Sequence, residues 1–141
     1  MARLETAEAW CESYIAAFNA ADAGQITAHW SFPALIFQAG GRLAFDNGER
    51  FTRNTAALLG FYARQGVARA ERAIAGRLDM GADGLALSVA DRMLDAEGDE
   101  IVSWRAAYVL QRLDGSWRAS AAFADGELAA WAQRGTPLGG K

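Results

Sequence analysis

One carboxylate in this sequence lies where an alternating pattern predicts an apolar face. Asp91 belongs to the segment 85–96, in which every second side chain from Leu85 to Met93 is otherwise hydrophobic. Burying a carboxylate without a partner costs roughly several kcal/mol, so Asp91 must be protonated, hydrogen-bonded or paired with a cation. A carboxyl group in such surroundings can act as a general acid or base.

Arg72 is the cation that the same alternation brings nearest to Asp91. A turn on Ala82-Asp83 would set Arg72 diagonal to Asp91, whereas a turn on Asp83-Gly84 would set it opposite Asp95. The pair is then either the catalytic couple of a pocket or an ion pair that only joins neighbouring strands. The sequence leaves both alternatives open.

His29 is the one histidine of the chain and precedes Trp30 on a predicted short helix. Its imidazole would titrate near neutral pH, which suits an acid–base group at the mouth of a cavity, but a lone histidine also fits a structural role. A single histidine and a single cysteine, Cys11, predict no metal site. No glycine-rich motif predicts a bound nucleotide, so we expect no cofactor.

The spacing of apolar residues indicates which elements hold these groups. It has the helical period over 4–21, 22–32 and 46–66. Alternation then predicts strands over 34–37, 42–45, 69–81, 85–96, 99–113 and 116–124. The 141 residues fit one α+β domain with its core over about 5–125, and we expect the tail that follows to be frayed.

Counting across the predicted turns assigns side chains to the two faces of the sheet. A turn on Asp114-Gly115 places Tyr108 opposite Ala121, and a turn on Glu97-Gly98 places Asp91 opposite Trp104. The concave face is then expected to carry Ile74, Leu78, Met80, Leu85, Leu87, Val89, Met93, Val102, Trp104, Tyr108, Leu110, Trp117 and Phe123. The outer face carries small residues and predicts the contact surface of a homodimer: Ala73, Ala75, Ala86, Ser88, Ala90, Ala107, Ser120 and Ala122.

Two segments, ESYIAAFNAADAGQITAHW and YVLQRLDGSWRASAAF, carry a resemblance to a known fold family. They resemble the opening helix pair and the closing hairpin of the nuclear transport factor 2-like superfamily, which includes ketosteroid isomerase, limonene epoxide hydrolase, scytalone dehydratase and small polyketide cyclases. The resemblance implies a cone-shaped barrel in which a curved, mostly antiparallel sheet wraps around three helices. Tyr14 falls where ketosteroid isomerase has its oxyanion-donating tyrosine, but the general-base position falls on Gln38, so the isomerase mechanism is not expected.

Composition argues against two classes of binding partner, nucleic acids and membranes. The net charge is −3 and the cations are scattered, so no basic stripe predicts nucleic acid binding. No apolar run approaches the ~20 residues of a membrane span, and we expect a cytoplasmic protein without a membrane partner. Arginine supplies all but one of the fourteen cations, a usage typical of bacteria with GC-rich genomes.

An apolar cavity is the predicted site, and its expected lining is aromatic: Tyr14, Phe18, Trp30, Trp104, Tyr108 and Phe123. Such a cavity suits a small hydrophobic ligand. One function is an enzyme of the cyclase, dehydratase or epoxide-opening type, with Asp91 and Arg72 as principal groups. The alternative is a non-catalytic module of the same fold that binds a ligand or another protein.

Overall fold

The computed structural model describes residues 3–138 and confirms the predicted α+β class. Its elements are, in chain order, α1 (Ala7–Asn19), α2 (Ala23–Thr27), β1 (Trp30–Gln38), β2 (Gly41–Phe45), α3 (Gly48–Arg64), β3 (Arg69–Asp79), β4 (Gly84–Leu94), β5 (Glu100–Leu113), β6 (Ser116–Phe123) and α4 (Asp125–Gln133). The strands form one sheet in the order β2-β1-β6-β5-β4-β3, in which β1 and β6 run parallel and the other neighbours antiparallel.

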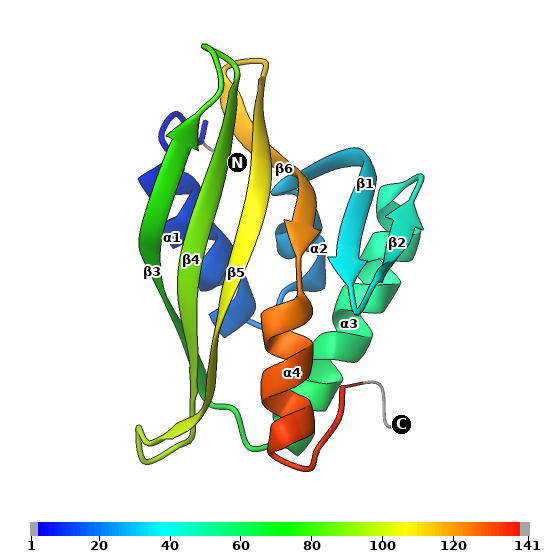
Figure 1. The fold of residues 1–141 in the computed structure, drawn as a ribbon, viewed down its shortest axis with the longest axis vertical. Helices are drawn as coiled ribbons and strands as arrows, with labels where there is room; N and C mark the ends of the chain where they lie inside the picture. The colour runs from blue at the N-terminus through cyan, green and yellow to red at the C-terminus, as the bar shows by residue number, and fades with distance from the viewer. Residues whose placement is uncertain (1–2, 139–141) are drawn as a thin grey trace.

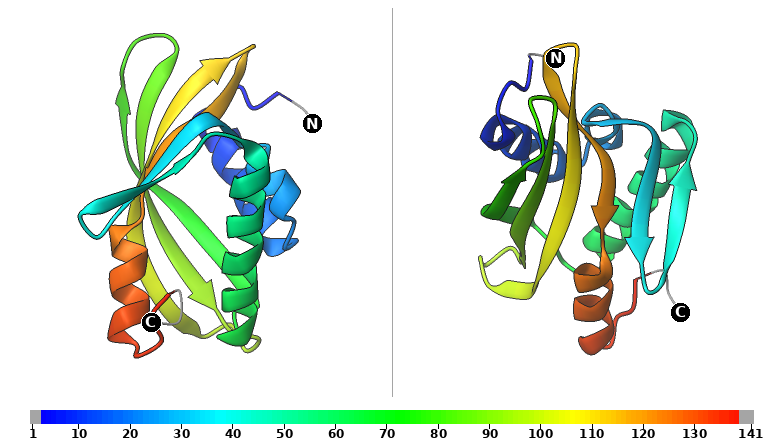
Figure 2. Two further views of the ribbon diagram at one scale, coloured as in Figure 1. Left: turned by 90° about the vertical axis from the view of Figure 1, so that its right-hand side faces the viewer. Right: turned by 45° about the horizontal axis from the view of Figure 1, so that its top comes forward.

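The sheet is strongly curved and does not close into a barrel (Figures 1 and 2). Helices α1, α2 and α3 cover its concave side, and α4 continues from the end of β6 and packs against β5 (Figure 1). None of the helices within residues 3–138 has both the length and the apolar character needed to cross a membrane.

Side-chain caps fix where the first three helices begin. Thr6 accepts a hydrogen bond from the backbone N–H of Ala9 at 3.0 Å, and Asp22 caps α2 in the same way through Gln25. Helix α3 is capped by Asn47, whose side chain accepts a hydrogen bond from the backbone N–H of Arg50 at 3.1 Å.

The sequence prediction placed His29 and Trp30 on the short second helix, and this is wrong. Helix α2 ends at Thr27, and Trp30 is the first residue of strand β1. The strand contains Pro33, which we expected to separate a helix from a strand. Since proline has no N–H for the sheet ladder, the pairing of β1 with β6 shifts register between Trp30 and Leu35.

Because of a β-bulge in β3, the predicted assignment of its side chains to the two faces of the sheet is wrong for part of the strand. The pairing with β4 shifts between Ile74 and Gly76, so the side chains after Ala75 change sides. Leu78 and Met80, expected on the concave face, are therefore 63% and 55% exposed.

A second bulge shifts the pairing of β5 with β6 between Val109 and Leu110. Tyr108 lies opposite Ala122 instead of Ala121, so Ala122 is buried on the concave face and not on the outer one. Phe123 pairs with Ala107 of the outer face and is 47% exposed. The pairing of β4 with β5 has no such shift before Met93, and the predicted position of Asp91 opposite Trp104 is confirmed.

The segment that follows β6 forms helix α4, which the sequence prediction did not include. Trp131 of α4 is fully buried, and its ring meets that of Phe61 edge to face with the centroids 5.0 Å apart. The predicted frayed segment also includes 139–141, which lie outside the described residues.

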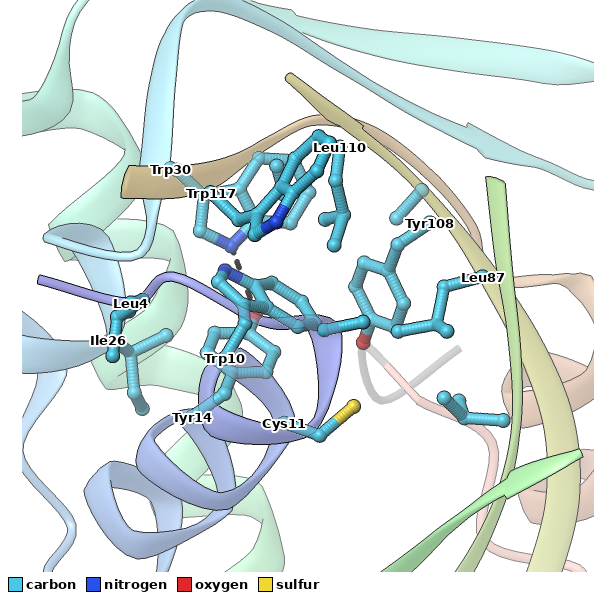
Figure 3. Close-up of a cluster of buried hydrophobic side chains, with 14 of the residues drawn as sticks. Leu4, Trp10, Cys11, Tyr14, Ile26, Trp30, Leu87, Tyr108, Leu110 and Trp117 are labelled. Carbon is cyan, nitrogen blue, oxygen red and sulfur yellow. Dashed lines mark hydrogen bonds between the residues drawn. The ribbon is translucent and has the colours of Figure 1, made fainter. Parts of the chain in front are cut away.

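Aromatic side chains from α1, β1 and β5 pack together in one cluster of the hydrophobic core (Figure 3). Trp10 stacks on Tyr14 with the ring centroids 4.8 Å apart, and Tyr108 meets Trp10 edge to face at 5.2 Å. The indole N–H of Trp30 donates to the Tyr14 hydroxyl at 2.8 Å (Figure 3). This core fixes the rings that line one end of the cavity.

Candidate functional site

A cavity of about 90 Å³ lies between the helices and the concave face of the sheet. Its walls include five of the six predicted aromatic groups as core residues: Tyr14, Phe18, Trp30, Trp104 and Tyr108. Phe123 borders it too, but its exposed ring stacks on Phe37 with the centroids 4.8 Å apart. A wider groove of about 780 Å³ shares the wall residues Ile36, Asn54, Leu58, Ala124 and Glu127 with the cavity.

The inner end of the cavity holds the predicted pair of Arg72 and Asp91. The bulge in β3 brings them directly opposite each other, a register that neither turn considered from the sequence would produce. The guanidinium binds the carboxylate with two hydrogen bonds, Nε to Oδ1 at 2.7 Å and Nη2 to Oδ2 at 2.8 Å. The two side chains are only 4% and 3% exposed, so this is a buried, bidentate ion pair.

Two tyrosines complete the surroundings of Arg72. Its Nη2 also donates to the Tyr108 hydroxyl at 2.8 Å, and its guanidinium carbon lies 5.3 Å from the centre of the Tyr14 ring. Burial opposes the charge of Arg72, but Tyr108 and Asp91 outweigh it and raise the pKa of the guanidinium well above its usual value. Burial also raises the pKa of Tyr108 to about 12, so this hydroxyl keeps its proton.

The predicted acid–base histidine lies elsewhere. His29 is buried between α1 and α2, and its ring nitrogens lie 2.7 Å from the Gln25 carbonyl and 2.7 Å from the Ser13 hydroxyl. Burial lowers its pKa, an effect that the Gln25 contact opposes. His29 is not part of the cavity wall, so the structure does not bring it together with Arg72 and Asp91.

Sequence reasoning missed a second carboxyl group in the cavity wall, Glu127 of α4. Its Oε2 accepts hydrogen bonds from the Tyr62 hydroxyl and from the indole N–H of Trp131, the latter at 3.2 Å. Burial raises the pKa of Glu127 to about 7, Asp91 adds to the rise, and the hydrogen bonds and Arg72 oppose it. This group is therefore protonated in a substantial fraction of molecules at neutral pH.

Glycine holds Glu127 in this position. A Cβ atom on Gly126 would lie 2.3 Å from the backbone oxygen of Arg105 in β5, so only glycine allows α4 to approach the strand so closely. The sequence contained a helix signal here, because Leu128 and Trp131 have helical spacing and Gly135 follows, a residue type that often ends a helix. In the structure, Gly135 has a φ of +87°. A helix at this point would have placed Glu127 in its first turn.

Two polar residues of α3 lie on the same part of the wall. Asn54 and Thr55 fall between Phe51 and Leu58 on the apolar side of the helix. Neither side chain makes a hydrogen bond within the described residues 3–138, and the same is true of Glu127 Oε1. Asn54 is exposed, and the buried side-chain atom that lacks a partner in this part of the chain is Arg72 Nη1 at the inner end. No three His, Cys, Asp or Glu side chains in this part of the chain cluster closely enough to hold a metal ion.

Comparisons with solved structures agree with this fold. A domain of unknown function with a cystatin-like fold from Nostoc punctiforme is 15% identical, with a TM-score of 0.66 over 82% of this chain and 71% of that one. A ketosteroid isomerase-like protein from Erwinia carotovora atroseptica is 19% identical, with a TM-score of 0.62 over 82% and 89%. An NTF-2 like protein of unknown function from Shewanella oneidensis is 9% identical, with a TM-score of 0.64 over 81% and 91%. At these identities the likeness extends to the fold alone.

Among curated proteins, no sequence matches the chain. A family model described as NTF2-like protein (DUF6841) matches residues 5–127, a range that ends on Glu127. The predicted resemblance is thereby confirmed, and the chain belongs to this NTF2-like family.

Proposed function

We propose that the protein binds a small, neutral and mostly apolar molecule in the cavity between its helices and its concave sheet. Binding of small hydrophobic ligands is common in the NTF2-like fold family. The walls of this cavity are rich in aromatic and aliphatic side chains, which is the usual lining of a small-molecule site.

One observation carries this proposal: an otherwise apolar cavity wall holds polar groups without a hydrogen-bond partner among residues 3–138. Arg72 Nη1 is such a group at the inner end. Asn54, Thr55 and Glu127 Oε1 are others at the outer end, where Asn54 and Glu127 also line the outer groove. A ligand that buries an apolar body among the rings can therefore satisfy one polar group at this end.

The charges of the site favour a neutral ligand. Arg72 and Asp91 neutralise each other through their bidentate contact, so the arginine has little attraction left for an anion. Glu127 contributes negative charge at the other end when it ionises. A carboxylate or phosphate in the inner cavity would thus lose its hydration without gaining a cation that is free of its own counter-ion.

The volume of the inner cavity limits how much of a ligand can be buried there. A dry, apolar cavity of about 150 Å³ is known to admit benzene. The inner cavity has about 90 Å³, which suits part of a six-membered ring, and the groove of about 780 Å³ has room for the remainder of a larger molecule.

The contacts of Asp91 support a binding module rather than acid–base catalysis by this residue. Both of its oxygens accept hydrogen bonds from Arg72, and this buried bidentate pair joins neighbouring strands as a structural ion pair does. The roles predicted for Asp91, Arg72 and His29 in catalysis, the homodimer formed through the outer sheet face and the interaction with another protein stay predictions.

Ligand-observed NMR with cyclohexanone and cyclohexanecarboxylate tests the proposal at pH 8. We expect cyclohexanone to bind and the carboxylate to bind at least about tenfold more weakly, since it must lose its hydration in an uncompensated site. Ala106→Leu should abolish binding because Ala106 is in the cavity wall. Ala107→Leu, one residue further along β5 on the outer face, is the matched control and should bind as the unchanged protein does.

Tighter binding of the carboxylate would contradict the proposal. So would cyclohexanone binding that survives Ala106→Leu, because the ring would then occupy some other place.

A further inference from the structure

Glu127 is the one carboxyl group that lines both the inner cavity and the outer groove among residues 3–138. Its two oxygens differ in their contacts. Oε2 accepts from two donors on different helices, Tyr62 of α3 and Trp131 of α4, while Oε1 makes no hydrogen bond within this part of the chain. One oxygen is thus fixed as an acceptor, and the other is left for a ligand.

From this geometry we infer that Glu127 binds the ligand as a neutral carboxylic acid, donating a hydrogen bond from Oε1 to an acceptor oxygen at the outer end of the ligand. The inference rests on the proposed function and adds the chemistry of the ligand: a neutral molecule with a carbonyl or ether oxygen on an otherwise apolar body. The proton comes from solvent, and no covalent bond changes.

The neighbouring groups are consistent with a neutral carboxyl. Its two donors, Tyr62 and Trp131, bond to Oε2, which is the carbonyl oxygen of the protonated form and can accept both. Burial raises the pKa of Glu127 to about 7, and an apolar ligand beside it removes still more water and favours the neutral form further.

The other ionisable groups around the site keep their charge states between pH 6 and 9. On α3, burial raises the pKa of Tyr62 well above its usual value, and on β5 it raises that of Tyr108 to about 12. Arg72 of β3 remains charged and bound to Asp91 of β4. Arg64 of α3, which lines the outer groove, is a permanent cation.

A matched pair of probes tests the inference. Cyclohexanone and methylenecyclohexane have nearly the same shape, but only the ketone offers an acceptor oxygen. At pH 6 we expect the ratio of the ketone affinity to the alkene affinity to be about fivefold higher than at pH 9, the worth of one hydrogen bond. At pH 9 the charged carboxylate cannot donate, and this gain for the ketone should be lost.

Glu127→Gln separates this role from a general effect of pH. The amide oxygen can still accept from Tyr62 and Trp131, and the amide N–H₂ still donates, but the group no longer titrates. We expect the variant to show the same ratio of ketone to alkene affinity at both pH values. Glu49→Gln is the control, because the Glu49 side chain is 82% exposed at the start of α3 and should leave the pH dependence unchanged.

The outcomes distinguish the two proposals. If both probes bind but their ratio is the same at pH 6 and pH 9, or Glu127→Gln keeps a pH-dependent ratio, the role of Glu127 is wrong and the cavity remains a binding site. If neither probe binds at either pH, the proposed function fails and the inference fails with it.

Discussion

The two ends of the cavity each contain a carboxyl group, buried for Asp91 and half-buried for Glu127, and the two groups are held in different ways. Asp91 at the inner end has a cation directly across the sheet, with both oxygens hydrogen-bonded to Arg72. Glu127 at the outer end has two neutral donors on one oxygen and no cation bonded to it. An ion pair keeps a buried carboxyl charged, whereas neutral donors alone leave its proton within reach of neutral pH.

The largest effect should follow from removing the charge of Asp91. Asp91→Asn leaves Arg72 buried without its counter-ion, and we expect a loss of about 3–5 kcal/mol in the free energy of unfolding, measured by chemical denaturation. Asp79→Asn is the control, since its pair with Arg77 is well exposed and should cost less than about 1 kcal/mol. Equal losses in the two variants would remove the distinction between a structural pair and a surface pair.

An intermediate effect is expected from Gly126→Ala, which acts on the outer end alone. The new methyl group would meet the Arg105 carbonyl and push α4 away from β5, costing about 1–3 kcal/mol in the free energy of unfolding. The control is Gly60→Ala in α3, whose Cβ would be 3.5 Å from the flexible Arg64 side chain; it should be stabilising by about 0.5–1 kcal/mol.

The displacement of α4 also has a spectroscopic readout. With Glu127 better hydrated, its pKa should fall from about 7 toward the usual value for glutamate, as followed by carboxyl ¹³C NMR. An unchanged titration midpoint in Gly126→Ala would show that close packing of this turn does not set the pKa of Glu127.

The smallest effect concerns the neutral donors at the outer end. The Tyr62 hydroxyl stabilises the charged form of Glu127, so Tyr62→Phe should raise the pKa of Glu127 and move its charging to higher pH. Tyr14→Phe is the matched control, because Tyr14 bonds to Trp30 and not to Glu127. A titration midpoint that falls in Tyr62→Phe would contradict the assigned direction of this hydrogen bond.

The regular part of the sheet could be predicted from the sequence, and its irregular points could not. The pairing of β4 with β5 is regular from Gly84 to Met93, and Asp91 lies opposite Trp104 as predicted. The prediction failed for Phe123, which lies beyond a bulge when counted from the turn at Asp114-Gly115, and for Leu78, which the β3 bulge separates from Arg72 and Ile74. Gly76 stands at the β3 bulge and is the residue that could have signalled it, since glycine inside a strand often marks a bulge.

The candidate site likewise has one part that could be predicted from the sequence and one part that could not. Asp91 and Arg72 were visible in the sequence because a charge interrupts an apolar pattern, although their register came from the bulge. Glu127 stands in a short segment after the last predicted strand for which no element was predicted, and it reaches the cavity only because Gly126 lets α4 lie against β5. Contacts between elements distant in the chain, such as Tyr62 with Glu127, have no local signature.

The outer groove is walled in part by 136–138, the segment that follows α4, while the inner cavity is built from the sheet, the first three helices and the first turn of α4. Under the proposed function, entry and anchoring of the ligand therefore depend in part on separate stretches of the chain. Substitutions in 136–138 can change which molecules gain access without altering the rings and the ion pair deep inside, whereas a change among those inner residues affects folding as well. A change of ligand preference would therefore disturb folding least if it arose from substitutions in 136–138.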